Sequence, residues 1–312
     1  MVFYFTATGN SLYAAKQLDK NCISIAHAIH DSDPTYQAEK MLSDMGIHPA
    51  YINVLLMVEN FLSAFDMNQQ KAMDKKVDEH LEMIRNDIEQ GKHYITPLPL
   101  GAIVTVAGTG SECNGGAVIT NEALKVKTGR DYPQCNPEFA LMDPTYTYTV
   151  PKKQMVSGSF DILSHIMETY FSEPNEDNVS DDISEALMRS VIKNLRAAIQ
   201  NPEDYTARSN LMWASTMAEN RVIKLGKKCD FECHQMEHQL GAYTDCNHGC
   251  GLAVLHPVYF RHIYKDGLPK FVQFAKNVWQ ISGEGKTEEE IAKAGVVALA
   301  DFIKEIGLPT TF

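Results

Sequence analysis

Five side chains in the second half of the 312-residue sequence have types and spacings that suit a metal ion. Asp161 and His165 are four residues apart, and His234 and His238 repeat that spacing. Residues four apart on a helix lie on one face, about one turn apart, so each pair can meet the same ion. His248 follows shortly after. Imidazole and carboxylate ligands together suit a borderline divalent ion such as Fe(II) or Zn(II).

Cysteines offer an alternative reading of the same region. They form two C-x3-C pairs, Cys229 with Cys233 and Cys246 with Cys250. A structural zinc site on these thiolates is a rival hypothesis, although the spacing is looser than that of zinc knuckles. A single histidine is more often a core or surface residue than a ligand, so the prediction depends on the whole pattern. His256 and His262 are expected to be surface or helix-face residues, without a ligand role.

The candidate ligands need helices to position them, and apolar spacing predicts such helices almost without interruption after Pro151. The expected helices span residues 153–172, 180–200, 204–225, 231–243, 251–264, 269–281 and 287–306. Short strands are expected before them, at 103–106, 116–120 and 139–142. The acidic run at 173–182 is expected to be a solvated loop and helix start.

The first part of the chain has a different pattern. Residues 2–20 predict a strand, the loop Thr6-Ala-Thr-Gly-Asn-Ser11 and a helix. The backbone N–H groups of such a loop, with the helix N-terminus, can bind a phosphate. A second strand is expected at 22–28 and a long amphipathic helix at 69–90. Gly91 follows this helix, which favours a boundary near residue 94.

Composition excludes several classes of function. The sequence has 28 Lys and Arg against 40 Asp and Glu, a net charge of −12, and it has no basic run, so nucleic acid is not an expected partner. No apolar stretch approaches the roughly 18 residues that a membrane span needs, so no membrane partner is expected. The first residues lack the positive region of a signal peptide. With seven cysteines, this favours reduced thiols and a cytoplasmic location.

Several motifs together identify a family resemblance. They are Thr105-Val-Ala-Gly-Thr-Gly-Ser-Glu112, Leu141-Met-Asp-Pro144, Asp161-Ile-Leu-Ser-His165, and His234-Gln-Met-Glu-His238 with His248-Gly249. In order and spacing, the stretch from Thr105 to Leu308 resembles the iron-containing (group III) alcohol dehydrogenases, most closely their butanol dehydrogenase-like branch. The resemblance implies hydride transfer between NAD(P) and a primary alcohol or aldehyde.

The resemblance also implies roles for particular residues. The implied ligands of Fe(II), or Zn(II), are Asp161, His165, His234 and His248. His238 would be the catalytic residue, beside the nicotinamide, where it helps to move protons. The loop that touches the dinucleotide would include Thr105, Thr109, Gly110 and Ser111, and Lys127 aligns with a lysine near the cofactor ribose.

Residues 1–94 depart from this family, because its Gly-Gly-Gly-Ser turn is not found there. They resemble a shortened flavodoxin-like domain instead. That resemblance implies a phosphate loop that would present Thr6, Thr8, Asn10 and Ser11 to FMN.

The expected fold is therefore an α/β N-terminal part with a parallel, flavodoxin- or Rossmann-like sheet, followed by an all-α metal-binding domain. Its expected parts are residues 1–94, a remnant of a dinucleotide-binding domain at 95–150, and a helical catalytic domain at 151–312, truncated at the C-terminus. Two alternative functions stay open: an FMN-binding electron-transfer module, and an inactive fusion that keeps only the metal site. The expected partner is a small alcohol or aldehyde, and a homodimer is an open alternative for assembly.

Overall fold

The computed structural model describes residues 3–4, 23–24 and 100–311, and the chain divides into two compact units, Met1–Leu100 and Gly101–Phe312. In the first unit, β1 (Phe3–Tyr4) and β2 (Ile23–Ser24) pair in parallel, with Phe3 opposite Ile23. Both strands lie within segments expected to be strands, and their parallel pairing agrees with the predicted fold class. The predicted phosphate loop and the helix at 69–90 lie outside the described residues.

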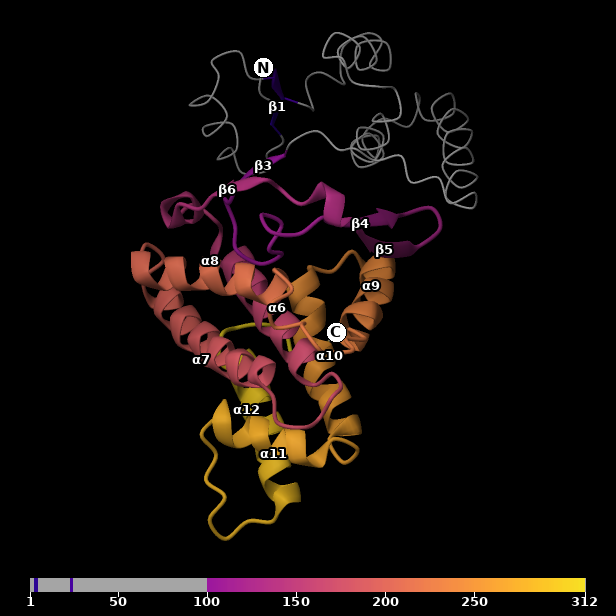
Figure 1. The fold of residues 1–312 in the computed structure, drawn as a ribbon, viewed down its shortest axis with the longest axis vertical. Helices are drawn as coiled ribbons and strands as arrows, with labels where there is room; N and C mark the ends of the chain where they lie inside the picture. Colours follow the sequence, from indigo (N-terminus) through magenta and orange to yellow (C-terminus); the bar gives the residue numbers. More distant parts are fainter. Residues whose placement is uncertain (1–2, 5–22, 25–99, 312) are drawn as a thin grey trace. The chain divides into compact units, whose positions relative to one another are not determined.

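The second unit begins with short strands. β3 (Gly101–Ile103) pairs in parallel with β6 (Phe139–Leu141). Between them, β4 (Gly116–Asn121) and β5 (Val126–Asp131) form an antiparallel hairpin, which lies beside α9 (Figure 1). β5 was not predicted, because its Lys-Thr-Gly-Arg-Asp stretch lacks an apolar pattern and the strand depends on hydrogen bonds to β4. Short 3-10 helices, η3 (Pro133–Cys135) and η4 (Pro144–Thr147), flank β6.

Helices make up most of the rest of this unit, as predicted. They are α6 (Lys152–Tyr170), α7 (Val179–Gln200), α8 (Tyr205–Glu219), α9 (Glu232–Thr244), α10 (His248–Ile263), α11 (Leu268–Asn277) and α12 (Glu288–Glu305). A small parallel sheet region followed by an all-helical part is the predicted fold class, and it is confirmed.

Three helix ends differ from the prediction by three residues or more, and one of them is the end of α11, at Asn277 and not near residue 281. α8 stops at Glu219 and not near residue 225, because the Asn220 side chain accepts a hydrogen bond from the Val222 backbone and Arg221 has a φ of 71°. Both features are incompatible with a continued helix. α10 begins at His248, earlier than residue 251, because Asn247 caps it by accepting a hydrogen bond from the Cys250 backbone. His248 is therefore held in a first helical turn.

α6 is the central helix of the second unit, and Figure 1 shows it passing between its neighbours. It packs against α7, α8 and α10. Every residue from Ser159 to Tyr170 is buried, and Phe160, Ile162, Leu163, Ile166 and Met167 are completely so. A helix surrounded on all sides must bury its polar residues as well, and these then require partners. Asp161, His165 and Glu168 are three of the buried ionisable residues of α6.

The acidic run at 173–182 is only partly the solvated segment that was predicted. Asp181 is completely buried, and its carboxylate pairs with the ammonium groups of Lys227 and Lys270, which are buried as well. A carboxylate can be buried in this way only with such partners. The prediction for Asp181 was wrong because both lysines come from distant parts of the chain.

Among the residues that the structure describes, no helix is long and apolar enough to cross a membrane.

Candidate metal centre

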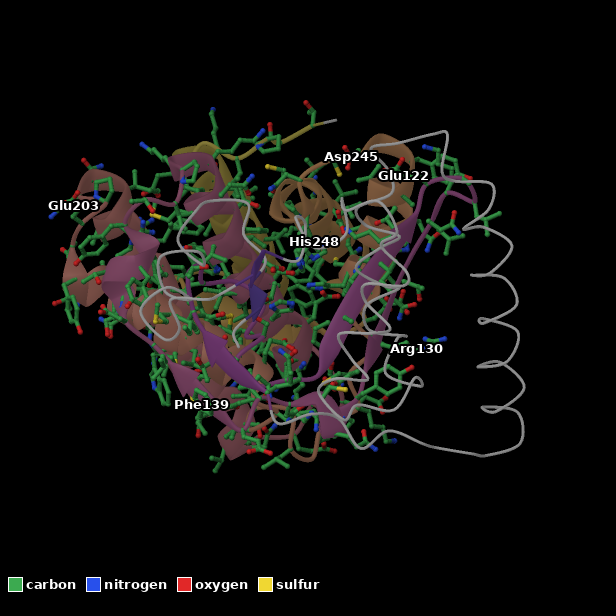
Figure 2. All side chains as sticks on the ribbon, turned by 90° about the horizontal axis from the view of Figure 1, so that it is seen from above. Glu122, Arg130, Phe139, Glu203, Asp245 and His248 are labelled. Carbon is green, nitrogen blue, oxygen red and sulfur yellow. The ribbon has the colours of Figure 1, made fainter. Side chains whose placement is uncertain are left out.

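The four predicted metal ligands come from three helices. Asp161 and His165 lie in the buried middle of α6, His234 lies in the first turn of α9, and His248 is the first residue of α10. Figure 2 shows His248 near the centre of the view, with Arg130 and Glu203 on opposite sides of it.

A close crossing holds the start of α10 against α6. A Cβ atom built on Gly249 would lie 2.3 Å from the backbone oxygen of Ser157, so only glycine fits there. Asn247 also holds the start of α10 against α6. Its side-chain amide donates to Gln154 Oε1 over 2.9 Å, and its side-chain oxygen accepts from the Ser157 hydroxyl. These contacts bring His248 to Asp161.

The ligand atoms converge on one carboxylate oxygen. Asp161 Oδ1 lies 3.4 Å from Nε2 of His234, 3.5 Å from Nε2 of His248 and 3.7 Å from Nε2 of His165. The rings of His165 and His234 stack with centroids 4.5 Å apart. The structure therefore brings all four predicted ligands together.

The donor set fits a divalent ion. Asp161 Oδ1 and His234 Nε2 are buried and have no hydrogen-bond partner. Buried polar atoms without partners are costly. Ligand atoms of Asp161, His234 and His248 all lie within 4.8 Å of one another, which is the arrangement that a shared cation would satisfy.

Carboxylates orient the histidines from behind. His234 Nδ1 bonds to Glu168, His248 Nδ1 bonds to the fully buried Glu237, and His165 Nδ1 lies 3.7 Å from Glu219. A carboxylate at Nδ1 places the proton there and leaves the Nε2 lone pair for a metal. The sequence prediction gave these glutamates no role. For two of them a signal existed: Glu168 follows His165 by three residues on the same helix face, and Glu237 precedes His238.

Charge interactions shift the pKa values of the cluster in different directions. Burial opposes ionisation of Asp161, but the three histidines outweigh it and lower its pKa. Burial also disfavours the charged form of His234, yet Asp161 and Glu168 raise its pKa to about 9. Burial dominates at His165 and lowers its pKa. In the absence of a metal ion, the two carboxylates thus favour the protonated form of His234. That proton supplies the positive charge which a bound cation would otherwise supply.

The predicted catalytic residue His238 lies beside the ligands and is half-buried, with its ring centroid 5.7 Å from that of His248. Burial, followed by the positive charges of Lys127 and His248, lowers its pKa to about 4. The imidazole is therefore neutral near pH 7 and able to accept a proton.

The loop predicted to touch the dinucleotide lies against α6 and α8. Backbone N–H groups of Gly108 and Gly110 both donate to Ser215 Oγ, over 3.0 and 3.2 Å. A Cβ atom built on Gly108 would lie 3.9 Å from Asp161 Oδ2, so the loop borders the metal cluster. Gly110 has a φ of 58°, a conformation that favours glycine. Of the predicted contacts, Gly110 is buried, Thr105 is half-buried, and Thr109 and Ser111 are exposed.

Lys127 points into the site. Its ammonium lies 2.9 Å from Glu237 Oε2 and 3.5 Å from His248 Nδ1. The structure therefore adds a contact at the metal cluster to the role near the cofactor ribose that the resemblance implies.

Other candidate residues are not brought to the cluster. Thr6, Thr8, Asn10 and Ser11 lie outside the described residues. The metal-capable groups found within residues 100–311 contain no cysteine, although Cys246 Sγ lies 3.9 Å from Glu237 Oε1. His262 is exposed as predicted, whereas the surface position predicted for His256 was wrong. His256 is completely buried and bonds through Nε2 to Ser164 Oγ at 2.7 Å.

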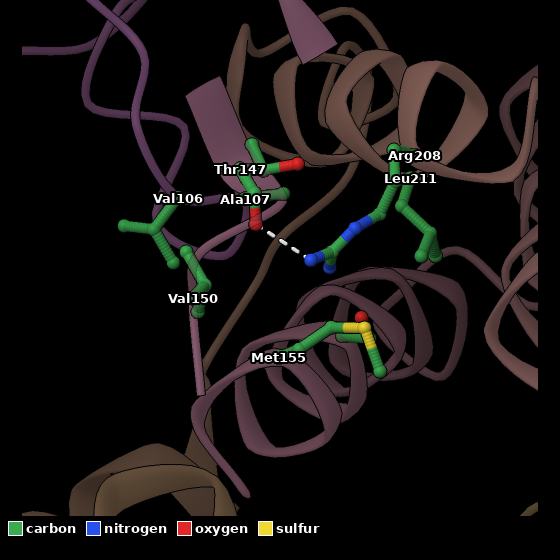
Figure 3. A pocket seen from close by; sticks show the side chains of 8 residues that line it. Val106, Ala107, Thr147, Val150, Met155, Arg208 and Leu211 are labelled. Atoms are coloured by element: carbon green, nitrogen blue, oxygen red, sulfur yellow. Dashed lines mark hydrogen bonds between the residues drawn. The ribbon is translucent and has the colours of Figure 1, made fainter. Parts of the chain in front are cut away.

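A separate pocket lies beneath the same loop (Figure 3). It is lined by Val106, Ala107, Thr147, Val150, Met155, Ser159, Arg208 and Leu211. The Arg208 guanidinium is buried and donates to the backbone oxygens of Thr147 and Pro202, over 2.6 and 2.9 Å. Arg208 thus ties α8 to η4, and none of the predicted metal ligands lines this pocket.

Comparison with known protein families agrees with this centre. Residues 155–312 match the model of the Fe-containing alcohol dehydrogenase family, C-terminal, and residues 68–144 match the model of iron-containing alcohol dehydrogenase. The chain belongs to the iron-containing alcohol dehydrogenase family. The second match begins inside residues 1–94, the part that the sequence prediction assigned to a flavodoxin-like segment, and the predicted domain boundaries stay predictions.

Relatives of the chain include proteins named as NADH- or NADPH-dependent oxidoreductases. The chain is 42% identical over 214 residues to NADH-dependent butanol dehydrogenase A of Clostridium acetobutylicum, covering 68% of this chain and 55% of that protein. It is 34% identical over 220 residues to the NADPH-dependent aldehyde reductase YqhD of Escherichia coli, covering 70% and 56%. The chain thus spans about half the length of the curated relatives that it matches.

The fold has a solved counterpart. The crystal structure of NADH-dependent butanol dehydrogenase A from Thermotoga maritima matches with a TM-score of 0.75 and 28% identity, covering 99% of this chain and 77% of that one.

Proposed function

We propose that the chain is a metal-dependent oxidoreductase that transfers hydride between NAD(P) and a primary alcohol or aldehyde of about butanol size. The observation that carries the proposal is the convergence of three Nε2 atoms on Asp161 Oδ1, with carboxylates behind their rings. Names of relatives support the substrate class, since they include an NADH-dependent butanol dehydrogenase and an NADPH-dependent aldehyde reductase.

The proposed metal ligands are Asp161, His165, His234 and His248, for Fe(II) or Zn(II). When bound, the ion would supply Lewis-acid chemistry, which favours the alkoxide of an alcohol and polarises an aldehyde carbonyl. Burial of Asp161 and His234 strengthens electrostatic interactions in the centre, because little water screens them.

His238 is proposed to move the alcohol proton. Its half-buried ring, neutral near pH 7, can accept a proton at the edge of the cluster and pass it to solvent. The loop of Thr105, Thr109, Gly110 and Ser111 is proposed to hold the dinucleotide. Its approach to Gly158 and Asp161 of α6 supports a nicotinamide position at the edge of the cluster, where His238 lies.

The test measures metal content and turnover on the full chain. We expect about one divalent ion per chain and butanal-dependent oxidation of NADH or NADPH that stops after chelation and returns with added metal. Metal without turnover would contradict the oxidoreductase proposal and favour an inactive chain that keeps the metal site. A flavin absorption spectrum on purification would favour the FMN alternative.

A further inference from the structure

A second group of metal-capable side chains adjoins the first. Glu237, His238 and His248 offer ligand atoms within 4.8 Å of one another. The ammonium of Lys127 already lies there, 2.9 Å from Glu237 Oε2 and 3.5 Å from His248 Nδ1. A divalent ion at the same point would be strongly repelled at this short distance. The Lys127 ammonium therefore occupies this position, and the position does not suit a second metal ion.

The space around this pair is shaped to hold it. The Glu237 side chain is completely buried and that of Lys127 is 15% exposed. A Cβ atom built on Gly241 would lie 3.1 Å from both Glu237 Oε1 and Lys127 Nζ, and one on Gly251 would lie 2.8 Å from Glu237 Cγ. Glycines on α9 and α10 thus leave room for the buried carboxylate and its lysine.

Two charges act on one metal ligand from behind. The Glu237 carboxylate bonds to His248 Nδ1, which fixes the ring and makes it a stronger donor at Nε2. Lys127 bonds to the same oxygen, Oε2, and its positive charge counteracts that of the carboxylate. It is also a cation close to the place where a second cation would bind, so its direct effect on metal affinity is unfavourable.

We propose that Glu237 and Lys127 are positioning residues that set the metal affinity of His248 in opposite directions: Glu237 increases it and Lys127 limits it. The inference rests on the metal centre proposed above. A purely structural ion pair would behave differently, because loss of either partner would leave a buried charge unpaired and weaken the site in both cases.

The experiment is a spectrophotometric Co(II) titration of the full chain after the native metal has been removed by a chelator. Glu237→Gln keeps the shape of the side chain and is expected to weaken Co(II) binding about 10- to 100-fold. Lys127→Met is expected to tighten it at least about threefold. Lys125→Met makes the same change of charge on an exposed side chain of the same hairpin, and is expected to stay within about twofold of wild type.

Weaker binding in both site variants, or no change in either, would overturn the inference while leaving the metal centre in place. A wild-type chain that takes up no Co(II) would contradict the metal centre and the inference together. If Glu237→Gln fails to fold, as judged by circular dichroism, the Lys127→Met variant still tests the inference. A loss of folded structure could only weaken Co(II) binding, so tighter binding in Lys127→Met would support the inference.

Discussion

At the scale of single residues, the partner of a buried histidine decides its charge. His234 and His256 are both buried, at 7% and 0% exposure. His234 faces two carboxylates, which overcome burial and raise its pKa to about 9. His256 has only the Ser164 hydroxyl within hydrogen-bond distance, and burial lowers its pKa to about 4. One histidine thus belongs to the candidate metal centre, and the other is a neutral part of the core.

Replacement of His234 by alanine should abolish metal retention. The change removes one of the four proposed ligands and leaves Glu168 without its histidine partner, while Asp161 Oδ1 keeps His165 and His248 beside it. Metal content after gel filtration, measured by mass spectrometry, checks this, with His262→Ala on the exposed face of α10 as the control. A His234→Ala chain with unchanged metal content would show that the ligand assignment is wrong.

Acid should destabilise the chain through His256. Its pKa is about 4 in the folded state and about 6.5 when unfolded, so between these values only the unfolded chain gains the proton. Stability is therefore lost as the pH falls from about 6.5 to about 4, by about 3 kcal/mol in all.

The measurement for His256 is the free energy of unfolding against pH. His256→Gln keeps a side chain that can both donate to and accept from the Ser164 hydroxyl, and it should lose less stability over this range than wild type. His262→Gln should follow the wild-type curve, since His262 is exposed on the same helix. Parallel curves for wild type and His256→Gln would contradict the assignment.

At the scale of secondary-structure elements, close helix contacts decide where the ligands meet. Gly249 lets α10 approach the α6 backbone at Ser157, and Gly158 of α6 lets the 105–112 loop approach, since a Cβ there would lie 2.6 Å from Ala107 O. The metal cluster and the predicted nucleotide loop are thus both fixed by short contacts to α6. Helix crossings of this kind allow little movement, because the opposing atoms belong to the backbone.

Gly249→Ala should therefore damage both stability and the site. Alanine favours a helix, but its Cβ would overlap the Ser157 oxygen and push His248 away from Asp161. We expect a loss of about 1–3 kcal/mol in unfolding free energy and weaker metal binding. Gly267→Ala, whose Cβ would meet only Phe271 at an ordinary 3.7 Å, is the control and should cost less than about 1 kcal/mol. Equal behaviour of the two variants would exclude the steric explanation.

At the scale of the molecule, the metal centre and the helical core belong to one folded unit. One cluster of buried apolar residues includes side chains from Val150 to Leu308. α6 contributes several of these apolar side chains, and the same helix carries the proposed ligands Asp161 and His165. Binding a cation at the centre should therefore stabilise the whole helical unit, because only the folded chain holds the ligands together.

Added Co(II) should raise the melting temperature of the chelator-stripped chain. At 100 times the dissociation constant the gain is about 2.7 kcal/mol. For a unit of this size that corresponds to roughly 5–10 °C. Trp213 and Trp279 both lie in the second unit, so tryptophan fluorescence reports its unfolding. Asp161→Asn should remove the shift, and a shift that persists in this variant would place the stabilising ion elsewhere.

Much of the helical unit, and most of the side chains that the structure brings together at the candidate metal centre, could be predicted from sequence. Helical periodicity is local, so residues three and four apart predict the faces of α6 and α9, and this placed Asp161 with His165 and His234 with His238. The choice of His234 and His248 as ligands came from the family resemblance and not from the spacing. Strand β5 and the early end of α8 were missed, because a hairpin partner and a left-handed residue leave little trace in apolar spacing.

The sequence by itself determined which residue types were available for a metal and which helices would carry them. Only the tertiary structure decided their partners: Glu168 for His234, Lys127 for Glu237, Ser164 for His256, and two lysines for Asp181. Each of these pairs joins residues more than 40 positions apart. Periodicity specifies which side of a helix is buried. The packing of one helix on another determines which donor or acceptor a buried polar or charged group contacts.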